Sequence, residues 1–87
     1  MNKLTDLPNI GPKISAQLHQ VGIHSPEQLL ETGSREAWLL IQKIDPSACY
    51  NRLCALEGAM LGLRRHELTP QVRISLKEFY KNNKIKI

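Results

Sequence analysis

Residues 4–16 read LTDLPNIGPKISA and are the most informative part of the chain. The turn at 8–11 contains asparagine and glycine, the two residue types that best tolerate left-handed backbone angles. Pro12 suits the first turn of a helix, and apolar residues then follow at the spacing of one helix face: Ile14, Leu18 and Val21. This segment predicts two helices joined by a tight turn, with Ile10 filling the gap between them.

The other prolines extend the helical prediction along the chain. Each of Pro26, Pro46 and Pro70 follows a residue that can cap a helix, and Ser25 with Gln28 has the pattern of a capping box. We therefore expect helices near residues 2–7, 12–21, 26–32, 35–44, 46–63 and 70–82. The predicted fold class is all-α, a compact bundle of five or six short helices over residues 1–83, followed by a frayed basic tail at 84–87.

Apolar residues at helical spacing in the later helices indicate the core. The expected core residues there are Ala37, Trp38, Ile41, Ile44, Leu53, Leu56, Met60, Leu63, Val72, Leu76, Phe79 and Tyr80. The apolar run around Trp38 is wider than one buried face needs, so Leu39 or Leu40 is a candidate contact surface. A second candidate is the small-residue face of Ala55, Gly58 and Gly62, where glycines inside a helix favour close approach by another helix. That helix belongs to the same chain or to a partner.

Composition excludes several classes of protein. The 87 residues suffice for one small domain, and no apolar segment is long enough to cross a bilayer or form a signal core, so we expect a cytoplasmic location. Cys49 and Cys54 have neither disulfide-framework nor metal-ligand spacing. We predict no metal, no cofactor and no catalytic site. The net charge is +4, and all of the excess lies after residue 44, which favours polyanions.

The start of the helix at residue 12 has the features of an anion site. Its first N–H groups have no partner within the helix, and Lys13 adds a full positive charge beside them. We therefore predict that Asn9, Ile10, Gly11 and Lys13 contact DNA phosphates, which carry no base identity.

Basic residues elsewhere are candidates for further phosphate contacts. Residues 29–37 faintly repeat the first segment 22 positions later, with Arg35 at the position that matches Lys13. Arg73, Lys77 and Lys81 form one stripe on the last helix. A solvated helix face is the alternative for the stripe. Packing of the turn without any DNA contact is the alternative for the whole site.

The segment at 4–23 resembles the helix-hairpin-helix motif of many DNA-binding proteins, whose hairpin typically reads Leu-Pro-Gly-Ile-Gly-Pro-Lys. Asn9 stands where that motif usually has its first glycine. Over residues 4–80 the chain also resembles the C-terminal domain of the TfoX/Sxy family of bacterial competence regulators. That resemblance rests on the hairpin, on residues 22–29, on Glu36-Ala37-Trp38, on Ala55-Leu56-Glu57-Gly58-Ala59 with Gly62, and on His66-Glu67-Leu68. Arg65 departs from it, because the family usually has an aromatic residue there, and fuller members carry a further N-terminal domain.

Two functions follow as hypotheses. The first is a non-enzymatic module, similar to competence and transcription regulators, that binds double-stranded DNA without sequence specificity through the phosphate contacts of the hairpin. The second is a protein-interaction adaptor or homodimer, in which the hairpin only packs and the contacts lie at Leu39, Leu40 or the Ala55/Gly58/Gly62 face.

Overall fold

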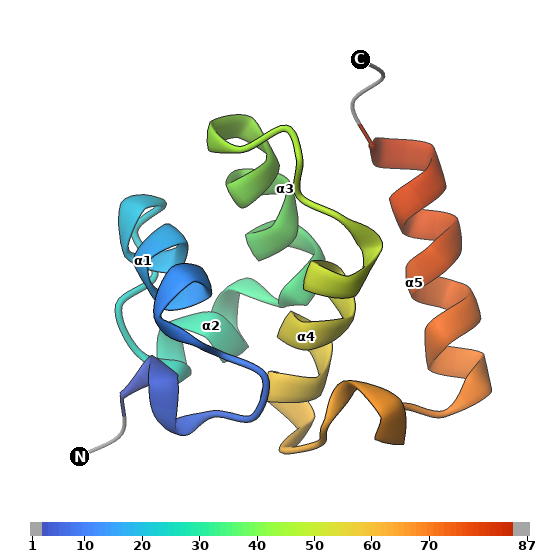
Figure 1. Cartoon of the computed structure of the whole chain (residues 1–87), viewed down its shortest axis with the longest axis horizontal. Coiled ribbons are helices and arrows are strands. Elements are labelled where there is room, and N and C mark those ends of the chain that lie inside the picture. The colour runs from blue at the N-terminus through green and yellow to red at the C-terminus, as the bar shows by residue number, and fades with distance from the viewer. Residues whose placement is uncertain (1–2, 85–87) are drawn as a thin grey trace.

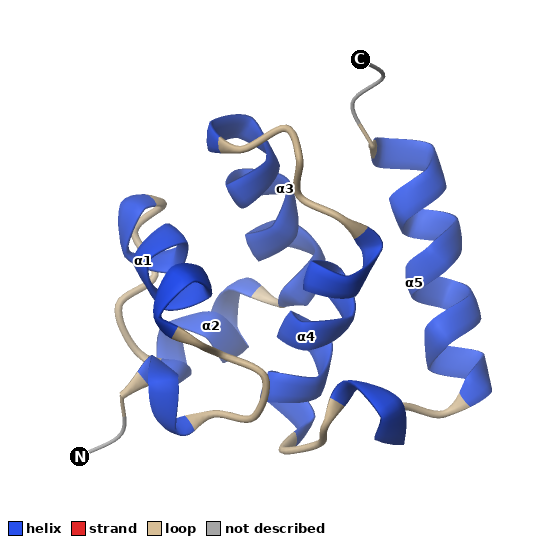
Figure 2. Cartoon of the chain, in the orientation of Figure 1, coloured by secondary structure: helices blue, strands red, loops and turns tan. Residues whose placement is uncertain are grey.

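The computed structural model describes residues 3–84. This part of the chain is a bundle of helices without a strand, and it measures 36 × 28 × 20 Å (Figures 1 and 2). Its elements, in chain order, are the 3-10 helix η1 (Leu4–Asp6), α1 (Pro12–Gln20), α2 (Pro26–Thr32), α3 (Ser34–Ile44), α4 (Tyr50–Leu61), the 3-10 helix η2 (Arg65–Glu67) and α5 (Pro70–Asn83). The predicted all-α bundle is confirmed. Most of the tail predicted at 84–87 lies outside the described residues.

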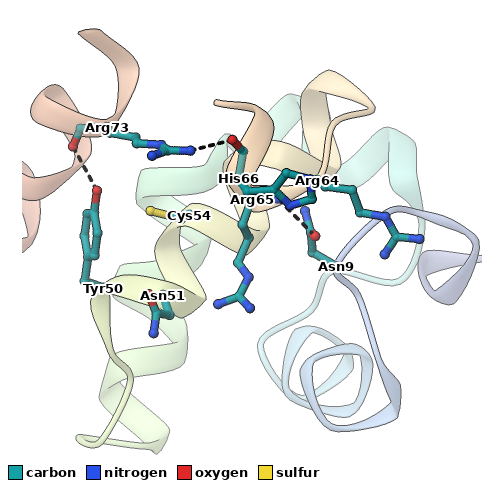
Figure 3. A pocket seen from close by; sticks show the side chains of 8 residues that line it. All are labelled: Asn9, Tyr50, Asn51, Cys54, Arg64, Arg65, His66 and Arg73. Atoms are coloured by element: carbon teal, nitrogen blue, oxygen red, sulfur yellow. Dashed lines mark hydrogen bonds between the residues drawn. The ribbon is translucent and has the colours of Figure 1, made fainter. Parts of the chain in front are cut away.

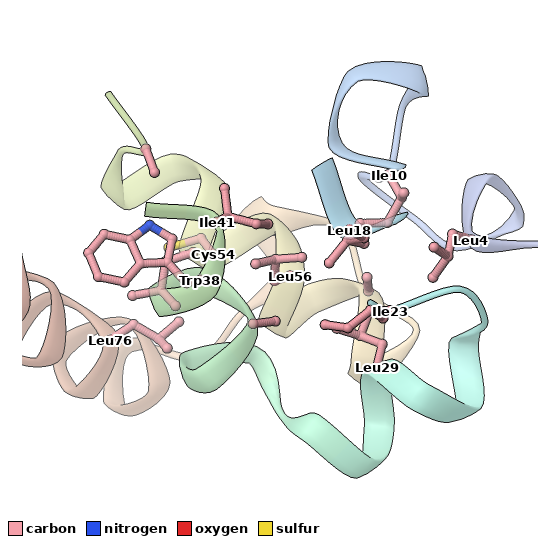
Figure 4. Close-up of a cluster of buried hydrophobic side chains, with 14 of the residues drawn as sticks. Leu4, Ile10, Leu18, Ile23, Leu29, Trp38, Ile41, Cys54, Leu56 and Leu76 are labelled. Atoms are coloured by element: carbon pink, nitrogen blue, oxygen red, sulfur yellow. The ribbon is translucent and has the colours of Figure 1, made fainter. Parts of the chain in front are cut away.

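Helix α4 lies at the centre of the bundle (Figure 1). It packs against α2, α3, α5 and η2, while α1 packs against η1 and α3. The large side chains with almost no exposed surface come from five helices: Leu18, Leu29, Trp38, Ile41, Leu53, Leu56 and Leu76 (Figure 4). Trp38 makes edge contacts with Phe79 and Tyr80 and donates its indole N–H to the carbonyl of Cys49 at 3.2 Å. Burial of this apolar set is the main stabilising contribution to the fold.

Local capping explains several helix starts. The hydroxyl oxygen of Ser25 accepts a hydrogen bond from the N–H of Gln28 at 3.2 Å, and Thr69 caps α5 in the same way through Val72. The side chain of Gln28 reaches back one residue farther than in a capping box, to the N–H of His24. The predicted boundaries of α2 and α5 are therefore correct to within one residue.

Two of the predicted helices, those expected at 2–7 and 46–63, are wrong at both ends. The helix expected over 2–7 is only the 3-10 turn η1, and Leu7 is extended at φ −80° and ψ 148°. The residue before a proline disfavours helical angles, and Leu7 precedes Pro8. The helix expected from residue 46 begins at Tyr50, because the Asp45 carboxylate accepts hydrogen bonds from the N–H and hydroxyl of Ser47 and closes a turn there.

The carboxyl end of α4 also differs from expectation. Gly62 adopts φ 73° and ends the helix, so it is a C-cap and not part of an interior helix face. The N–H of Leu63 then donates to the carbonyl of Gly58 at 2.8 Å, turning the chain back across the helix end. Ile44, expected in the core, is the last residue of α3 and is 47 % exposed.

Candidate functional site

The turn between η1 and α1, residues 7–11, is called the 7–11 turn below. Asn9 lies at its centre with φ 69°, the left-handed conformation that the sequence predicts for this position. Ile10 is 5 % exposed and enters the core, as expected. Gly11 has φ −92°, and a Cβ placed on it would meet nothing within 4 Å. Asn9, and not Gly11, is therefore the residue whose backbone angles the turn requires.

The outer side of the turn carries main-chain donors without a partner. Gly11 is the N-cap of α1 and makes no side-chain cap. The N–H groups of Gly11, Lys13 and Ile14 make no hydrogen bond within the described part of the chain, since the first bond of the helix is from Ser15 to the Gly11 carbonyl. Gly11 and Lys13 are exposed. Two of the three donors at the start of α1 thus belong to exposed residues, whereas Ile14 is half-buried.

The inner side of the turn is anchored by the Asn9 side chain. Its Nδ2 donates to the Leu63 carbonyl at 2.9 Å and to the Ala55 carbonyl at 3.5 Å, and its Oδ1 accepts from the N–H of Arg65 at 3.3 Å. These bonds attach the turn to the end of α4 and to η2. The Asn9 amide is therefore used within the chain, and its hydrogen-bonding atoms are not offered to a ligand.

Gly58 is the position that lets Asn9 and Leu63 approach α4. A Cβ on Gly58 would lie 2.6 Å from the Leu63 carbonyl oxygen and 2.7 Å from Nδ2 of Asn9. The close approach expected at the small-residue face is made by the same chain, and Ala55 and Gly58 are buried there. At the other candidate contact surface, Leu39 and Leu40 are half-buried, and Leu39 packs against the core.

An open cavity of about 570 Å³ adjoins the anchor of the turn and is called the basic cavity below (Figure 3). Three arginines and a histidine line it, and no carboxylate does; the lining residues are Asn9, Tyr50, Asn51, Cys54, Arg64, Arg65, His66 and Arg73. A second cavity of about 450 Å³ lies beside the turn itself and is lined by residues 5–11 and Arg64. Arg64 borders both cavities.

The walls of the basic cavity are held by hydrogen bonds. The guanidinium of Arg73 donates to the His66 carbonyl, and the Tyr50 hydroxyl donates to the Arg73 carbonyl at 3.1 Å (Figure 3). Burial is the main cause that raises the pKa of the Tyr50 hydroxyl, and the neighbouring Cys54 thiol is the second. The hydroxyl is protonated at neutral pH, as an ordinary tyrosine is, and it can donate a hydrogen bond. These contacts link α4, η2 and α5 around the cavity.

The remaining basic residues predicted as phosphate contacts lie apart. Of the stripe on α5, only Arg73 lines the basic cavity, whereas Lys77 and Lys81 are exposed farther along the helix. Arg35 donates to the Ser75 hydroxyl at 2.9 Å and lies 5.9 Å from the Phe79 ring centre. It borders a different cavity, which Glu36 and Glu57 also line. Of the predicted contacts, Asn9 lines both of these cavities, Ile10 and Gly11 line the one beside the turn, and Arg73 lines the basic cavity. Lys13 lines neither of the two, and Arg35 lies elsewhere.

Sequence reasoning missed Arg64, Arg65 and His66 as site residues. Two signals pointed toward them: the excess positive charge after residue 44, and the arginine at position 65 where the resembled family usually has an aromatic residue. Over residues 3–84, no three His, Cys, Asp or Glu side chains gather as a metal-binding group. None of the described helices has the length and apolar character of a membrane span.

Comparisons with known proteins agree with the fold. The model of the TfoX C-terminal domain matches residues 1–80. A crystal structure of an uncharacterized protein from Listeria monocytogenes, in a triclinic form, is 42 % identical with a TM-score of 0.91, covering 92 % of this chain and 91 % of that one. A protein of unknown function from the same organism, in a tetragonal form, is 43 % identical with a TM-score of 0.89, covering 91 % and 96 %. Among curated proteins there is no match.

Proposed function

This chain belongs to the family of TfoX C-terminal domains, and we propose that it is a non-enzymatic module that binds double-stranded DNA without sequence specificity. The observation that carries the proposal is the set of unpartnered N–H groups at Gly11, Lys13 and Ile14 at the start of α1, where Gly11 and Lys13 are exposed. Main-chain donors at a helix N-terminus suit phosphate oxygens, which look alike at every base pair.

The charges near the turn favour an anion over a neutral partner. Lys13 is the second residue of α1, where a positive charge opposes the helix dipole and costs about 0.3–1 kcal/mol. A bound phosphate would turn that cost into a favourable contact. Arg64 borders the cavity beside the turn, whose only carboxylate, on Asp6, accepts a hydrogen bond from the N–H of Lys3 at 2.9 Å.

The Asn9 anchor supports the proposal because it fixes the turn. Three hydrogen bonds hold Asn9 to Ala55, Leu63 and Arg65, so the exposed donors are held in place before a ligand arrives. A site of fixed geometry loses less conformational entropy on binding than a mobile loop does. The same anchor favours the alternative that the turn is only a packing unit, and binding measurements separate the two.

The experiment is a titration of a blunt DNA duplex at several salt concentrations. With three or four basic groups on phosphates, the logarithm of the affinity falls against the logarithm of salt concentration with a slope of about −3. Duplexes of different sequence bind alike. Absence of binding at low salt, or binding that salt does not weaken, contradicts the proposal.

A matched pair of variants locates the contact. Lys13→Gln is expected to lower the affinity for the duplex and to reduce the salt slope by about 0.9, the value of one phosphate contact. Lys43→Gln removes the same charge at the carboxyl end of α3 and leaves the affinity nearly unchanged. Equal losses of affinity in the two variants would show that the binding is a general attraction between charges and not a contact at Lys13.

The second candidate function is a protein-interaction adaptor. Of its two predicted contact surfaces, the Ala55/Gly58 face is packed within the chain, so the region of Leu39 and Leu40 remains for a partner. Both side chains are half-buried, so each retains some apolar surface. Sedimentation of the purified chain distinguishes a dimer from a monomer. A dimer that Leu40→Ser dissociates, together with no DNA binding, would favour this candidate.

A further inference from the structure

We propose that the basic cavity binds a single nucleotide through its phosphate and its base. The proposal extends the proposed function, because a strand lying on the 7–11 turn can continue past Arg64, which borders both cavities. The nucleotide chemistry comes from one of two sources: an unpaired nucleotide at the end of a DNA strand, or a free nucleotide.

The size and charge of the cavity fit this ligand. Its volume of about 570 Å³ lies within the range of about 300–1,000 Å³ typical of small-molecule sites. Arg64, Arg65 and Arg73 line it without an opposing carboxylate. A guanidinium presents two parallel N–H groups to two phosphate oxygens, so this lining favours a phosphorylated ligand over a neutral one.

Arg73 and Arg65 are the two arginines placed to bind the phosphate, and only Arg73 is already held by a hydrogen bond of its side chain. Arg73 is oriented by its hydrogen bond to the His66 carbonyl, which leaves its other N–H groups for a ligand. Arg65 makes no side-chain hydrogen bond within the described residues, and its side chain extends toward Asn51, whereas Arg64 extends toward the turn (Figure 3). Arg65 is therefore the side chain that a bound phosphate would order.

The wall formed by the start of α4, beside these arginines, suits a base. The ring of Tyr50 lies there, held by its hydroxyl bond to the Arg73 carbonyl, and the exposed amide of Asn51 offers both a donor and an acceptor. Aromatic faces stack on any base, and an amide pairs with its edge. A base inside a duplex cannot reach this wall because it is stacked and paired, so the ligand is unpaired or free.

The test follows the backbone amide signals of the full chain by NMR during titration with deoxyadenosine monophosphate. The expected shifts are at residues 50–54 and 64–66. Arg65→Gln is expected to weaken this binding about tenfold, the loss of one charge-assisted pair, and it removes no packing because Arg65 is exposed. Lys43→Gln is the matched control and leaves the affinity unchanged. Deoxyadenosine and inorganic phosphate each bind more weakly than the nucleotide, since each lacks one of the two contacts.

Duplex DNA with a short single-stranded overhang distinguishes the two sources of the nucleotide. Tighter binding than to the blunt duplex, lost in Arg65→Gln, identifies a strand end. Binding of the monophosphate without any overhang preference identifies a free nucleotide. The proposal is overturned if the monophosphate shifts no amide around the cavity, or if Arg65→Gln leaves its affinity unchanged. Blunt-duplex binding that depends on Lys13 and not on Arg65 would survive that result, so failure here is separable from failure of the proposed function.

Discussion

The side-chain amide of Asn9 donates a hydrogen bond to the main-chain carbonyl of Leu63, 54 positions away, with 2.9 Å between Nδ2 and the oxygen. This bond holds the 7–11 turn against the end of α4, next to the basic cavity that Asn9 also lines. Its neighbourhood accounts for the glycine at position 58, where a Cβ would collide with both partners.

Two substitutions of Asn9 distinguish the contribution of its hydrogen bonds to stability from the cost of its left-handed backbone angle. Asn9→Gly is expected to lower the free energy of unfolding by about 1 kcal/mol, since the loss of three side-chain bonds is partly offset by relief of the left-handed backbone. Asn9→Ala keeps the strained angle and is expected to cost about 1 kcal/mol more. Urea denaturation measures both values. Equal stabilities of the two variants would contradict the left-handed conformation.

Substitution of Gly58 tests the close approach at α4. Gly58→Ala gains about 1 kcal/mol of helix propensity but must move the Leu63 carbonyl or the Asn9 amide, and overpacking costs about 1–3 kcal/mol. We expect a net loss of stability in thermal denaturation. In the Asn9→Gly background the loss is smaller, because one of the two colliding groups is gone. A variant as stable as the parent chain would show that the carbonyl moves freely.

Substitution of Gly11 by serine is expected to raise the stability of the chain and to lower its affinity for DNA. Gly11 has extended N-cap angles, and a hydroxyl there accepts a hydrogen bond from the N–H of Lys13 or Ile14. Gly11→Ser is therefore expected to stabilise the chain by about 0.5 kcal/mol and to weaken duplex binding, because it occupies a donor proposed for phosphate. Melting temperature and a DNA titration on the same sample check both effects. An increase in affinity would contradict the proposed contact.

The carboxyl of Asp45 is expected to make the chain less stable as the pH falls into the acid range. Hydrogen bonds from Ser47, then Gln17, then Arg52 hold the pKa of its carboxyl well below the ordinary value of 3.8. A group with a lowered folded-state pKa contributes stability that is fully present above its unfolded value and is lost as the pH falls through the folded value. Unfolding measured between neutral pH and strong acid should show this loss. Asp45→Asn, with no carboxyl at this position, should show a smaller dependence.

The sequence predicts those elements whose signals are local. Ser25 and Thr69 cap their helices through residues three positions away, so the pattern alone locates α2 and α5. Asp45 and Gly62 were misassigned because each residue type has two local uses. An aspartate before a proline caps a helix or closes a turn, and a glycine lies inside a helix or ends it.

The candidate site is predictable only in part, for a physical reason. The unpartnered donors of α1 follow from Pro12 and from the geometry of any helix start. The basic cavity depends on where α4 ends, and on bonds from Asn9 to Leu63 and Arg65 across more than fifty positions. No periodicity or spacing encodes such contacts, so the excess of positive charge after residue 44 does not by itself identify Arg64 and Arg65 as cavity-lining residues.

The Asn9 anchor also limits how far this domain can be shortened. A peptide ending before Tyr50 would retain the whole 7–11 turn in sequence but lack the Ala55 and Leu63 carbonyls that hold it. Such a peptide would also lack Leu53, Leu56 and Leu76 of the core, so neither the turn nor the helices around it would stay folded, and its amides would exchange rapidly with solvent. The smallest chain that keeps a rigid turn must therefore extend through η2, and any ligand gripped there will protect the entire molecule against melting.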